Sequence, residues 1–522
     1  IDETFINRHD SHIRSMKKHI VLYNPRPVKE ETKTDVSLAL LSVAAIPYSQ
    51  GYPIKYVNSS NNNAMDKVMQ LSKSALCVGF TVMTSYQVKD AIDVTRKVKT
   101  KYPGAIIVWG GWHPSILPEQ TINDKDIDIV VIGQGQRTFA EIVEALDNGK
   151  PLNHIKGIMY KEGSNIVKTE QRPFEDINNF PPLPYEIVES EQELFANSEN
   201  PGDKIIFYYT SQGCPHRCKF CADPLVYKHR ITMLSAERVV ADIERFVKKY
   251  NITGVHCVDT NFWVSEKRVQ DICRLLLDKG ISIKWVLLNG RTEQLLKMSD
   301  ETWNLLKKIN LTSIFVGAES GSEDTMRYLQ KDATVRDTIE LTKKCKQQGV
   351  RICYSFLLGL PPNPNSKAPH SVQIKEEWNA LVNLIDEIVA ITKENTFVTN
   401  VYKPYPGTAM EEICRKNGYK EPDTLDGWAN YTTDKGGLTW LPKRYISLIN
   451  QLEVLYLPIL TDESYKKLNK YGVAGKFARL FYFLMHATVM LRWKTKFYSF
   501  PIEYYILKNS KQFARKYILR SS

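Results

Sequence analysis

Three cysteines lie close together near the middle of the chain, at Cys214, Cys218 and Cys221. Their C-x3-C-x2-C spacing places three thiols within eight residues, which allows them to ligate three corners of one cubane iron–sulfur cluster. Four cysteines are the rule in electron carriers, so three ligands leave one iron open to a small molecule. The alternative is a zinc knuckle that uses His216 as its fourth ligand. Such sites usually pair two C-x2-C hooks, and the sequence contains no second hook.

Phe220 directly precedes the third cysteine, and with it the motif resembles the signature of the radical SAM superfamily. The resemblance implies a 4Fe-4S cluster whose open iron binds the amino and carboxylate groups of S-adenosyl-L-methionine (SAM). In that family the reduced cluster cleaves SAM to a 5′-deoxyadenosyl radical. The resemblance therefore also implies a reducing partner, such as flavodoxin or ferredoxin.

Further stretches match the same family at the ends of expected strands. By this resemblance Asp259 lies near the methionine part of SAM, Glu319 hydrogen-bonds the ribose hydroxyls and Gly359 lies near adenine. The other residues expected at SAM are Phe220, Arg291 and Ser320. Arg291 is suited to pair with a carboxylate as a fork. An internal ion pair between Asp259 and Arg291 is an equally weighted alternative. Glu319 stands between two glycines at a strand end, where a bare carboxylate needs a partner.

The elements around this motif alternate between strands and helices from residue 204 onward. Six parallel strands with helices outside them close naturally into a partial barrel, and the chemistry then lies at the strand ends. The cysteine loop directly follows the first of these strands. The expected strands cover 205–210, 254–259, 283–288, 313–317, 350–358 and 397–402.

A separate strand–helix alternation fills the first 150 residues. Five expected strands, at 19–23, 54–57, 75–80, 105–109 and 127–132, predict an open, doubly wound parallel sheet of the Rossmann-like type. Glycines fall at the strand ends, where a flat cofactor needs close approach to the backbone. The pattern alone favours a ligand site and plain turns equally.

The same stretch resembles the cobalamin-binding domain that precedes many radical SAM cores. Two departures stand out: the D-x-H-x-x-G motif that supplies a lower-face histidine is absent after the first strand, and Gln134 and Gln136 replace the glutamates common in relatives. By the resemblance, the residues that line the corrin site are Thr84, Ser85, Gly110, Gly111, His113, Gly133 and Gly135.

Composition and length set the remaining limits. The 522 residues are 43% apolar and 25% charged, as in soluble multidomain proteins. We expect a cobalamin domain over 1–150, a connector with a hairpin over 151–203, a radical SAM domain over 204–405 and a helical basic domain over 406–522. The other six cysteines are scattered singly, and the chain opens without a signal peptide, so we expect a reduced, cytoplasmic protein.

The net charge of +12 is concentrated in the C-terminal tail. Residues 466–522 contain thirteen Lys and Arg but one acid, Glu503, whereas the preceding chain is neutral. This argues against a nucleic-acid partner over the catalytic region. Within the tail, residues 480–491 form an apolar run that is shorter than the about 20 residues needed to span a bilayer. We expect a helical cap on the barrel mouth. A helix that lies on an anionic membrane surface, or that binds an acidic substrate, is the alternative.

These features together predict a cobalamin-dependent radical SAM enzyme that methylates an unactivated carbon, by hydrogen abstraction followed by methyl transfer from methylcobalamin. The substrate is a small molecule or is lipid-like. A cyclase or ring-rearranging enzyme of the same architecture, as in tetrapyrrole ring closure, is the alternative. A tRNA methylthiotransferase would need more N-terminal cysteines than Cys77. From another class, a non-catalytic cobalamin-binding scaffold stays open.

Overall fold

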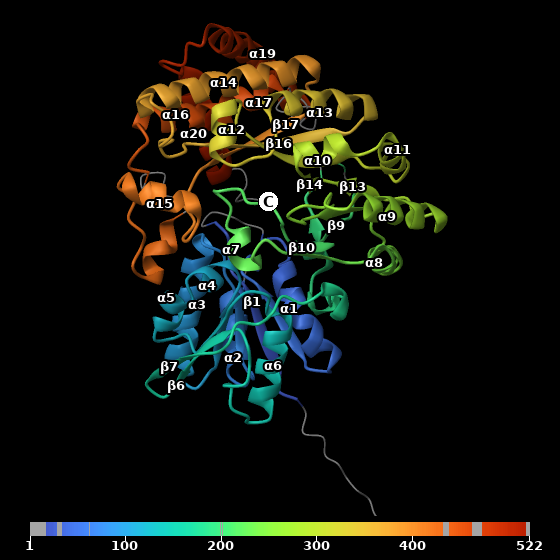
Figure 1. Cartoon of the computed structure of the whole chain (residues 1–522), viewed down its shortest axis with the longest axis vertical. Coiled ribbons are helices and arrows are strands. Elements are labelled where there is room, and N and C mark those ends of the chain that lie inside the picture. The colour runs from blue at the N-terminus through green and yellow to red at the C-terminus, as the bar shows by residue number, and fades with distance from the viewer. Residues whose placement is uncertain are drawn as a thin grey trace, which may run out of the picture.

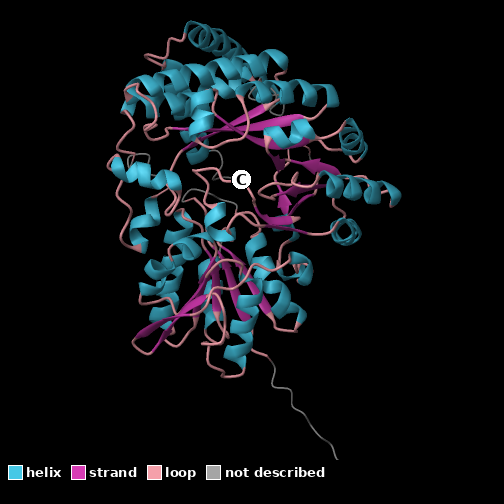
Figure 2. Cartoon of the chain, in the orientation of Figure 1, coloured by secondary structure: helices cyan, strands magenta, loops and turns pink. Residues whose placement is uncertain are grey.

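A computed structural model describes residues 17–28, 34–61, 63–198, 200, 202–431, 438–461 and 472–517. Two α/β bodies are stacked along the long axis, and α19 (Gly472–Thr495) of the C-terminal region lies at the end far from the first sheet (Figure 1). The strands form two groups with helices around them (Figure 2). This is the architecture expected from the alternation of strands and helices.

The first body is built on a seven-stranded sheet in the order β2-β1-β3-β4-β5-β6-β7. Its first five strands pair in parallel, and β1 is buried at every position, as in a sheet covered on both faces. The strand order reverses between β1 and β3, and such a switch point is where open α/β sheets bind ligands. The strands are β1 (Ile20–Asn24), β2 (Ile54–Asn58), β3 (Val78–Thr81), β4 (Ile107–Gly110) and β5 (Ile129–Val131).

Helices connect these strands. Gln87 and six further residues of α3 are buried, so this helix presents a continuous face to the sheet. The helices are α1 (Leu38–Ser49), α2 (Ala64–Ser72), α3 (Tyr86–Lys101), α4 (Trp112–Ile116), α5 (Pro118–Asn123) and α6 (Gly135–Asp147).

The hairpin expected after residue 150 consists of β6 (Ile158–Glu162) and β7 (Asn165–Lys168). It pairs antiparallel with β5 and so extends the first sheet instead of standing apart from it. Ile158, Met159 and Tyr160 are buried, which explains why the hairpin packs there. The chain then crosses to the second body through three short 3-10 turns between Ile177 and Leu194.

The second body confirms the predicted partial barrel. Its parallel strands run in the order β9, β12, β13/β14, β15, β16, β17, and the short β8 (Phe195–Ala196) pairs antiparallel with β9. The third strand is divided at Leu287, whose φ of 53° breaks the ladder and splits the barrel into two sheets. The strands are β9 (Ile205–Tyr208), β12 (Gly254–Cys257), β13 (Lys284–Val286), β14 (Leu288–Gly290), β15 (Ser313–Glu319), β16 (Arg351–Leu358) and β17 (Thr396–Val401).

The helices of this body begin where the sequence provides caps. Ser235 accepts a hydrogen bond from Arg238 N at the start of α8, and Thr334 begins α13 with a full capping box. The helices are α8 (Ala236–Tyr250), α9 (Glu266–Asp278), α10 (Thr292–Lys297), α11 (Asp300–Lys308), α12 (Glu323–Tyr328), α13 (Val335–Gln348) and α14 (His370–Ile391).

The C-terminal region is helical, as predicted, but its last helices pack elsewhere than expected. Trp493 at the end of α19 donates a hydrogen bond of 2.6 Å to Asp386 on α14, the helix between β16 and β17. The end of α19, just after the apolar run, therefore packs on the outside of the barrel and not at its mouth. The elements are α15 (Ala409–Lys416), α16 (Lys443–Gln451), the π-turn Leu452–Tyr456, α17 (Leu457–Leu460), α19 (Gly472–Thr495) and α20 (Ile502–Tyr517). Among the described residues, every helix is too short or too polar to cross a membrane.

A segment after α15 connects this region to the first body. Asp426 forms an ion pair of 2.6 Å with Arg96 on α3, and Trp428 donates a hydrogen bond of 2.7 Å to Gln120 on α5. Tyr209 adds a second bridge, because its hydroxyl lies 2.8 Å from that of Ser42 on α1. The two bodies are therefore held together by side chains from opposite ends of the sequence.

Candidate cofactor sites

The three motif cysteines lie in one loop between β10 (Ser211–Gly213) and α7 (Asp223–Tyr227). All three thiols are half-buried, and Cys221 N donates to Cys218 O at 3.2 Å, which folds the loop back on itself. The pKa of Cys221 is raised to about 12, chiefly by burial, with the charges of Cys218 and Cys214 adding to it. Three thiolates this close need a compensating cation, so the loop fits an iron–sulfur cluster.

Arg291 reaches this loop from the end of β14. Its Nη1 lies 3.1 Å from Cys218 Sγ, its Nη2 lies 3.0 Å from Asp332 Oδ2, and its Nε donates to Glu293. Burial by itself would lower the pKa of Arg291, but the charges of Cys218 and Glu293 raise it above its ordinary value, so the buried guanidinium stays positively charged beside the cluster ligand. The alternative of an internal pair with Asp259 is wrong, since the carboxylates at Arg291 are Glu293 and Asp332.

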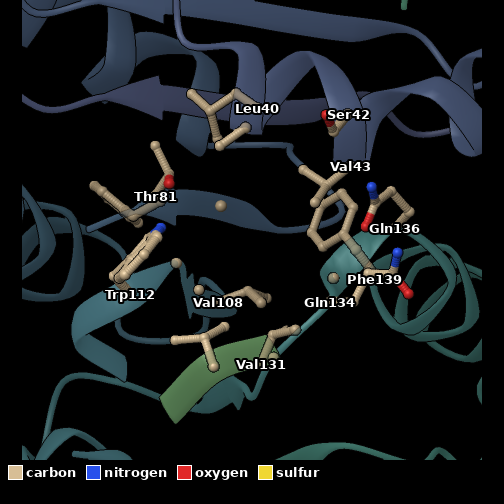
Figure 3. Close-up of a pocket in the computed structure, with 18 of the residues that line it drawn as sticks. Leu40, Ser42, Val43, Thr81, Val108, Trp112, Val131, Gln134, Gln136 and Phe139 are labelled. Atoms are coloured by element: carbon tan, nitrogen blue, oxygen red, sulfur yellow. The ribbon is translucent and has the colours of Figure 1, made fainter. Parts of the chain in front are cut away.

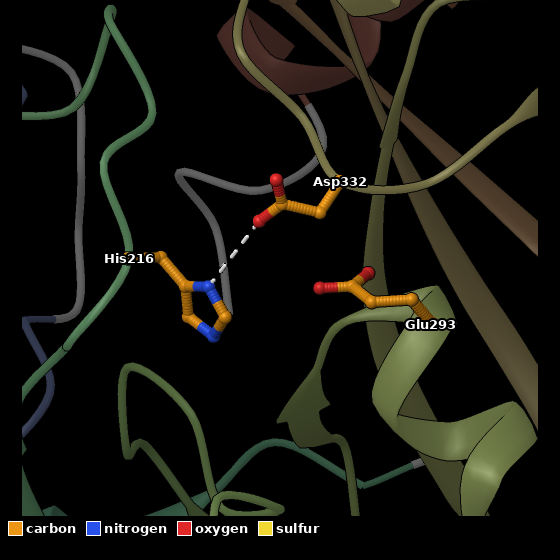
Figure 4. A group of neighbouring side chains, drawn as sticks. All are labelled: His216, Glu293 and Asp332. Carbon is orange, nitrogen blue, oxygen red and sulfur yellow. Dashed lines mark ion pairs between the residues drawn. The ribbon is translucent and has the colours of Figure 1, made fainter.

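His216 lies beside the carboxylates of this network, Glu293 and Asp332 (Figure 4). Its Nδ1 lies 3.6 Å from Asp332, and its Nε2 lies 3.3 Å from the amide of Gln294. With both ring nitrogens engaged, His216 is poorly placed to complete a zinc knuckle. The carboxylates of Glu293 and Asp332, which with His216 resemble a cation site, already have the cationic guanidinium of Arg291.

Asp259 is buried behind the cysteine loop. Its carboxylate accepts hydrogen bonds from Thr210 N, from the Thr210 hydroxyl and from Ser211 N, at the start of the strand that leads into Cys214. Burial raises the pKa of Asp259, and the bonds from Thr210 act against that shift. The contacts of Asp259 are therefore with the protein, and they fix the direction in which the loop leaves β9.

Glu319 ends β15 with a φ of 60°, a conformation that a non-glycine residue adopts only under local constraint. The constraint comes from Lys331, whose Nζ lies 2.8 Å from Glu319 Oε1. Gly317 makes room for this pair, because a Cβ there would lie 2.2 Å from Glu319 Oε1. Sequence reasoning did not identify Lys331, because an isolated lysine twelve residues after a strand-end glutamate carries no local signal.

The other expected SAM residues surround the same strand ends. Ser320 is buried, and its hydroxyl accepts a hydrogen bond from Ser322 N at 3.1 Å. Gly359 has a φ of 74°, and its carbonyl accepts a hydrogen bond of 3.0 Å from the indole of Trp440. Phe220 is half-buried against the core. The residues expected at SAM thus all lie at the strand ends of the barrel or in the cysteine loop.

Asp223 is a second residue that sequence reasoning missed. It is 1% exposed, its Oδ2 has no partner, and its Oδ1 lies 3.5 Å from the hydroxyl of Thr260, next to Asp259. Burial raises the pKa of Asp223 to about 7. The available signal was its position two residues after Cys221, where a helix begins. A buried carboxyl with an unpaired oxygen beside the cluster loop is suited to accept a proton from a polar ligand.

A cavity of about 120 Å³ opens at the switch point of the first sheet (Figure 3). Of the residues expected at cobalamin, Gly110, Gly111, Gly133 and Gly135 line it. A side chain is excluded at Gly111, whose φ is 98° and whose Cβ would lie 2.9 Å from Val82 N. The strand ends thus form a backbone cradle, as a flat cofactor requires. The lining residues that were not expected include Leu40, Thr81, Trp112, Phe139, Gln212 and Tyr227.

Gln134 and Gln136, noted as departures from the family pattern, behave differently from each other. Gln134 is used by the protein: its amide donates to Glu175 O at 3.1 Å and to Gln212 Oε1 at 3.2 Å. Gln136 lines the cavity, is 3% exposed, and its Nε2 has no partner. An unpaired buried donor at a cavity wall fits a ligand that carries amide or phosphate oxygens, as cobalamin does.

Thr84, Ser85 and His113 lie outside the lining of this cavity. Ser85 caps α3, and Thr84 Oγ1 lies 3.2 Å from His113 Nδ1. The His113 ring packs edge-on against Trp428, with ring centroids 5.5 Å apart. Burial lowers the pKa of His113 to about 3, so the ring is neutral. Within the described part of the chain, histidine is absent from the cavity wall.

The cysteine loop joins the two sites. Gln212 on β10 lies two residues before Cys214, Tyr227 ends the helix that follows Cys221, and both line the cavity of the first body. The Tyr227 ring also packs edge-on against Trp112 at 6.2 Å. The two elements that flank the three-thiol loop, β10 and α7, therefore also form part of the cavity wall.

Comparison with known proteins agrees with this geometry. Residues 32–143 match the B12 binding domain, and residues 208–372 match the Radical SAM superfamily. An uncharacterized methyltransferase of Pyrococcus horikoshii is 28% identical over 359 residues, which are 68% of this chain and 72% of that protein. An anaerobic magnesium-protoporphyrin IX monomethyl ester cyclase of Rubrivivax gelatinosus is 22% identical over 61% of this chain and 57% of its own length.

A solved structure shares the whole arrangement. The cobalamin-dependent S-adenosylmethionine radical enzyme OxsB, with aqua-cobalamin and S-adenosylmethionine bound, superposes with a TM-score of 0.68 at 16% identity. The match covers 96% of this chain and 75% of OxsB, so it includes the C-terminal helices. Together the two family models match more than half of the chain, the B12 binding domain first and the Radical SAM domain second, and the chain belongs to the cobalamin-dependent radical SAM enzymes, with a 4Fe-4S cluster, SAM and cobalamin as its cofactors.

Proposed function

We propose that this protein methylates an unactivated carbon of a small-molecule substrate. The observation that carries the proposal is the shared loop: Gln212 and Tyr227, which flank the three cysteines, also line the cavity of the B12 binding domain. One substrate carbon held at this loop is within reach of chemistry from both sides. The similarity to an uncharacterized methyltransferase supports the same reaction.

The chemistry itself belongs to the bound groups: SAM on the cluster supplies the radical that removes a hydrogen atom, and cobalamin supplies the methyl group. The protein binds and orients them. Cys214, Cys218 and Cys221 hold the cluster, and Arg291 keeps a positive charge at 3.1 Å from one cluster ligand. Glu319 offers its second oxygen to a hydroxyl, because its first oxygen is held by Lys331.

The glycine cradle accepts cobalamin, and Gln136 offers it a donor. Among the described residues the cavity wall contains no histidine, so bound cobalamin would not take a histidine ligand from this wall. A corrin spectrum that shows nitrogen ligation by a protein histidine would rule this out.

Ring closure without methyl transfer is the second candidate, favoured by the similarity to the anaerobic cyclase. The two reactions share hydrogen abstraction and differ in the fate of the SAM methyl group. A protein electron donor, such as a flavodoxin or ferredoxin, is part of the proposal for either reaction, because cleavage of SAM consumes an electron.

The deciding experiment uses full-length protein purified without oxygen, with its cluster and cobalamin restored, and SAM labelled in its methyl group. We expect 5′-deoxyadenosine after addition of a reductant, and label recovered with the extracted corrin. Deoxyadenosine without label on the corrin would favour the cyclase. The variant Cys218→Ala should retain cobalamin and lose deoxyadenosine formation, whereas unchanged formation would reject the cluster assignment and revive the scaffold reading.

A further inference from the structure

Large hydrophobic side chains are exposed in one part of the C-terminal region. Of the fifteen exposed large hydrophobic residues in the described chain, seven lie between residues 483 and 506. They are found on the outer face of α19, in the loop after it and at the start of α20. We call them the C-terminal apolar patch: Phe483, Leu491, Phe497, Phe500, Ile502, Tyr505 and Ile506.

The patch is distinct from the packing face of the same helices. On α19, Met485, Val489 and Trp493 follow one another at four-residue spacing and are buried against the barrel. Phe483 and Leu491, which are 71% and 64% exposed, lie on the other side. A helix that needs only one neighbour carries polar residues on its outer face, so the apolar outer face requires a second partner.

Charge identifies the class of that partner. Between residues 483 and 509 the one acid, Glu503, forms an ion pair of 3.0 Å with Arg492. The side chains of Lys494, Lys496 and Lys508 are exposed in the same segment and leave it positive. In sequence, four more basic residues follow Lys508 and no acid does.

Exposed aromatic and aliphatic side chains beside lysines match a bilayer surface, where apolar groups enter the acyl boundary and lysines meet anionic headgroups. Phe500, in the loop between α19 and α20, is the most exposed side chain of the patch at 82% and is the first candidate for insertion into the bilayer. A protein partner would need both an apolar surface and an acidic rim around it. An anionic bilayer provides both, with its acyl chains and its headgroups.

We infer that the C-terminal apolar patch attaches this protein peripherally to an anionic lipid bilayer. In Figure 1, α19 lies at the end of the molecule away from the first sheet, so attachment there leaves the B12 binding domain clear of the membrane. The inference does not depend on the proposed reaction, because binding to vesicles requires no turnover.

The test is co-sedimentation of the full-length holoprotein with phosphatidylcholine vesicles, with and without about one third phosphatidylglycerol. We expect binding to the anionic vesicles, weaker binding to the neutral ones, and a decrease in about 0.5 M salt. The variant Phe500→Asp/Ile502→Asp should lower the partition coefficient by roughly tenfold or more. Aspartate tolerates the φ of 52° at position 500, so the variant should keep its corrin and cluster spectra.

A control is Ile166→Asp, which removes a less exposed apolar side chain (41%) from β7 in the first body and should bind as the wild type does. The variant Lys494→Glu/Lys508→Glu should lose the preference for anionic vesicles. Absence of binding, or equal binding by the wild type and Phe500→Asp/Ile502→Asp, would overturn the inference. So would a dimer in solution that the same variant dissociates, because the patch would then bind a second copy of the chain.

Discussion

The Nζ atom of Lys331 lies 2.8 Å from Oε1 of Glu319, and their side chains are 6% and 10% exposed. Burial by itself would lower the pKa of Lys331, but the carboxylate of Glu319 and the nearby Cys218 raise it above its ordinary value. The lysine is therefore charged, and it orients the carboxylate expected at the SAM ribose. Lys331 is a positioning residue that acts through Glu319.

Replacing Lys331 should destabilise the folded protein, because it leaves the buried carboxylate of Glu319 without a counter-ion. For Lys331→Met we expect the free energy of unfolding to fall by about 3 kcal/mol, because Glu319 loses its counter-ion in a buried site. Thermal denaturation of the holoprotein measures this change, and equilibrium dialysis should show weaker SAM binding.

The double variant Lys331→Met/Glu319→Gln is the control. Removing the charge along with its partner should restore most of the lost stability but not the binding of SAM. If the double variant is as unstable as Lys331→Met, packing of the lysine side chain and not its charge is what matters. If SAM binding is normal in both variants, Glu319 does not contact SAM.

Gln136 provides a prediction for the other cofactor. Its unpaired Nε2 faces the cavity, so Gln136→Leu should weaken cobalamin binding by roughly tenfold, the equivalent of one hydrogen bond. Absorbance of the corrin retained after dialysis measures this, and the cluster content should stay unchanged.

The substitution Gln136→Glu tests which atom is used. Glutamate is the residue common in relatives, but it accepts hydrogen bonds and does not donate them when ionised. If the donor is required here, Gln136→Glu should bind cobalamin as weakly as Gln136→Leu does. Wild-type affinity in Gln136→Glu would show that the acceptor oxygen makes the contact.

Sequence reasoning succeeded where the signal was local. The cysteine spacing and the glycines at Gly110 and Gly111 each lie within a few residues, and the fold around them follows from alternation. The break at Leu287 left the predicted third strand in place but divided it, since one positive φ has no signature in a leucine.

Contacts between residues that lie far apart in the sequence could not be predicted from local patterns. His113 was expected at the corrin by resemblance to the cobalamin-binding domain. Thr84 and Trp428 instead contact its ring, and Trp428 comes from a segment far along the chain. Lys331 and Asp223 acquire their roles only through burial beside Glu319 and the cysteine loop. The position of α19 depended likewise on Asp386, a partner that no local pattern indicates.

The neutral His113 predicts acid sensitivity. Its pKa is about 3 in the folded protein and about 6.5 when unfolded, so the stability it contributes is complete above pH 6.5 and is lost as the pH falls toward 3. At pH 5 the loss is about 2 kcal/mol. Denaturant titrations at several pH values should show this loss in the wild type and not in His113→Gln.

His154 is the matched control, because it lies exposed on the surface of the first body. The variant His154→Gln should keep the wild-type dependence on pH. An unchanged pH profile in His113→Gln would show that the ring accepts a proton without unfolding the surrounding contacts.

Glu377 on α14 predicts the opposite dependence. Its side chain is buried, its Oε1 has no partner, and burial raises its pKa to about 8. A carboxyl whose pKa is higher in the folded state contributes stability below its unfolded pKa of about 4.5 and loses it as the pH rises through 8. The free energy of unfolding of Glu377→Gln, which stays neutral, should therefore match that of the wild type near pH 4.5 and exceed it by about 2 kcal/mol at pH 6.

The exposed neighbour Glu376 gives the control, since Glu376→Gln should show the stability of the wild type at every pH. Equal stability of Glu377→Gln and the wild type at pH 8 would mean that Glu377 ionises at a normal pH, and hence that water reaches it between α14 and α16.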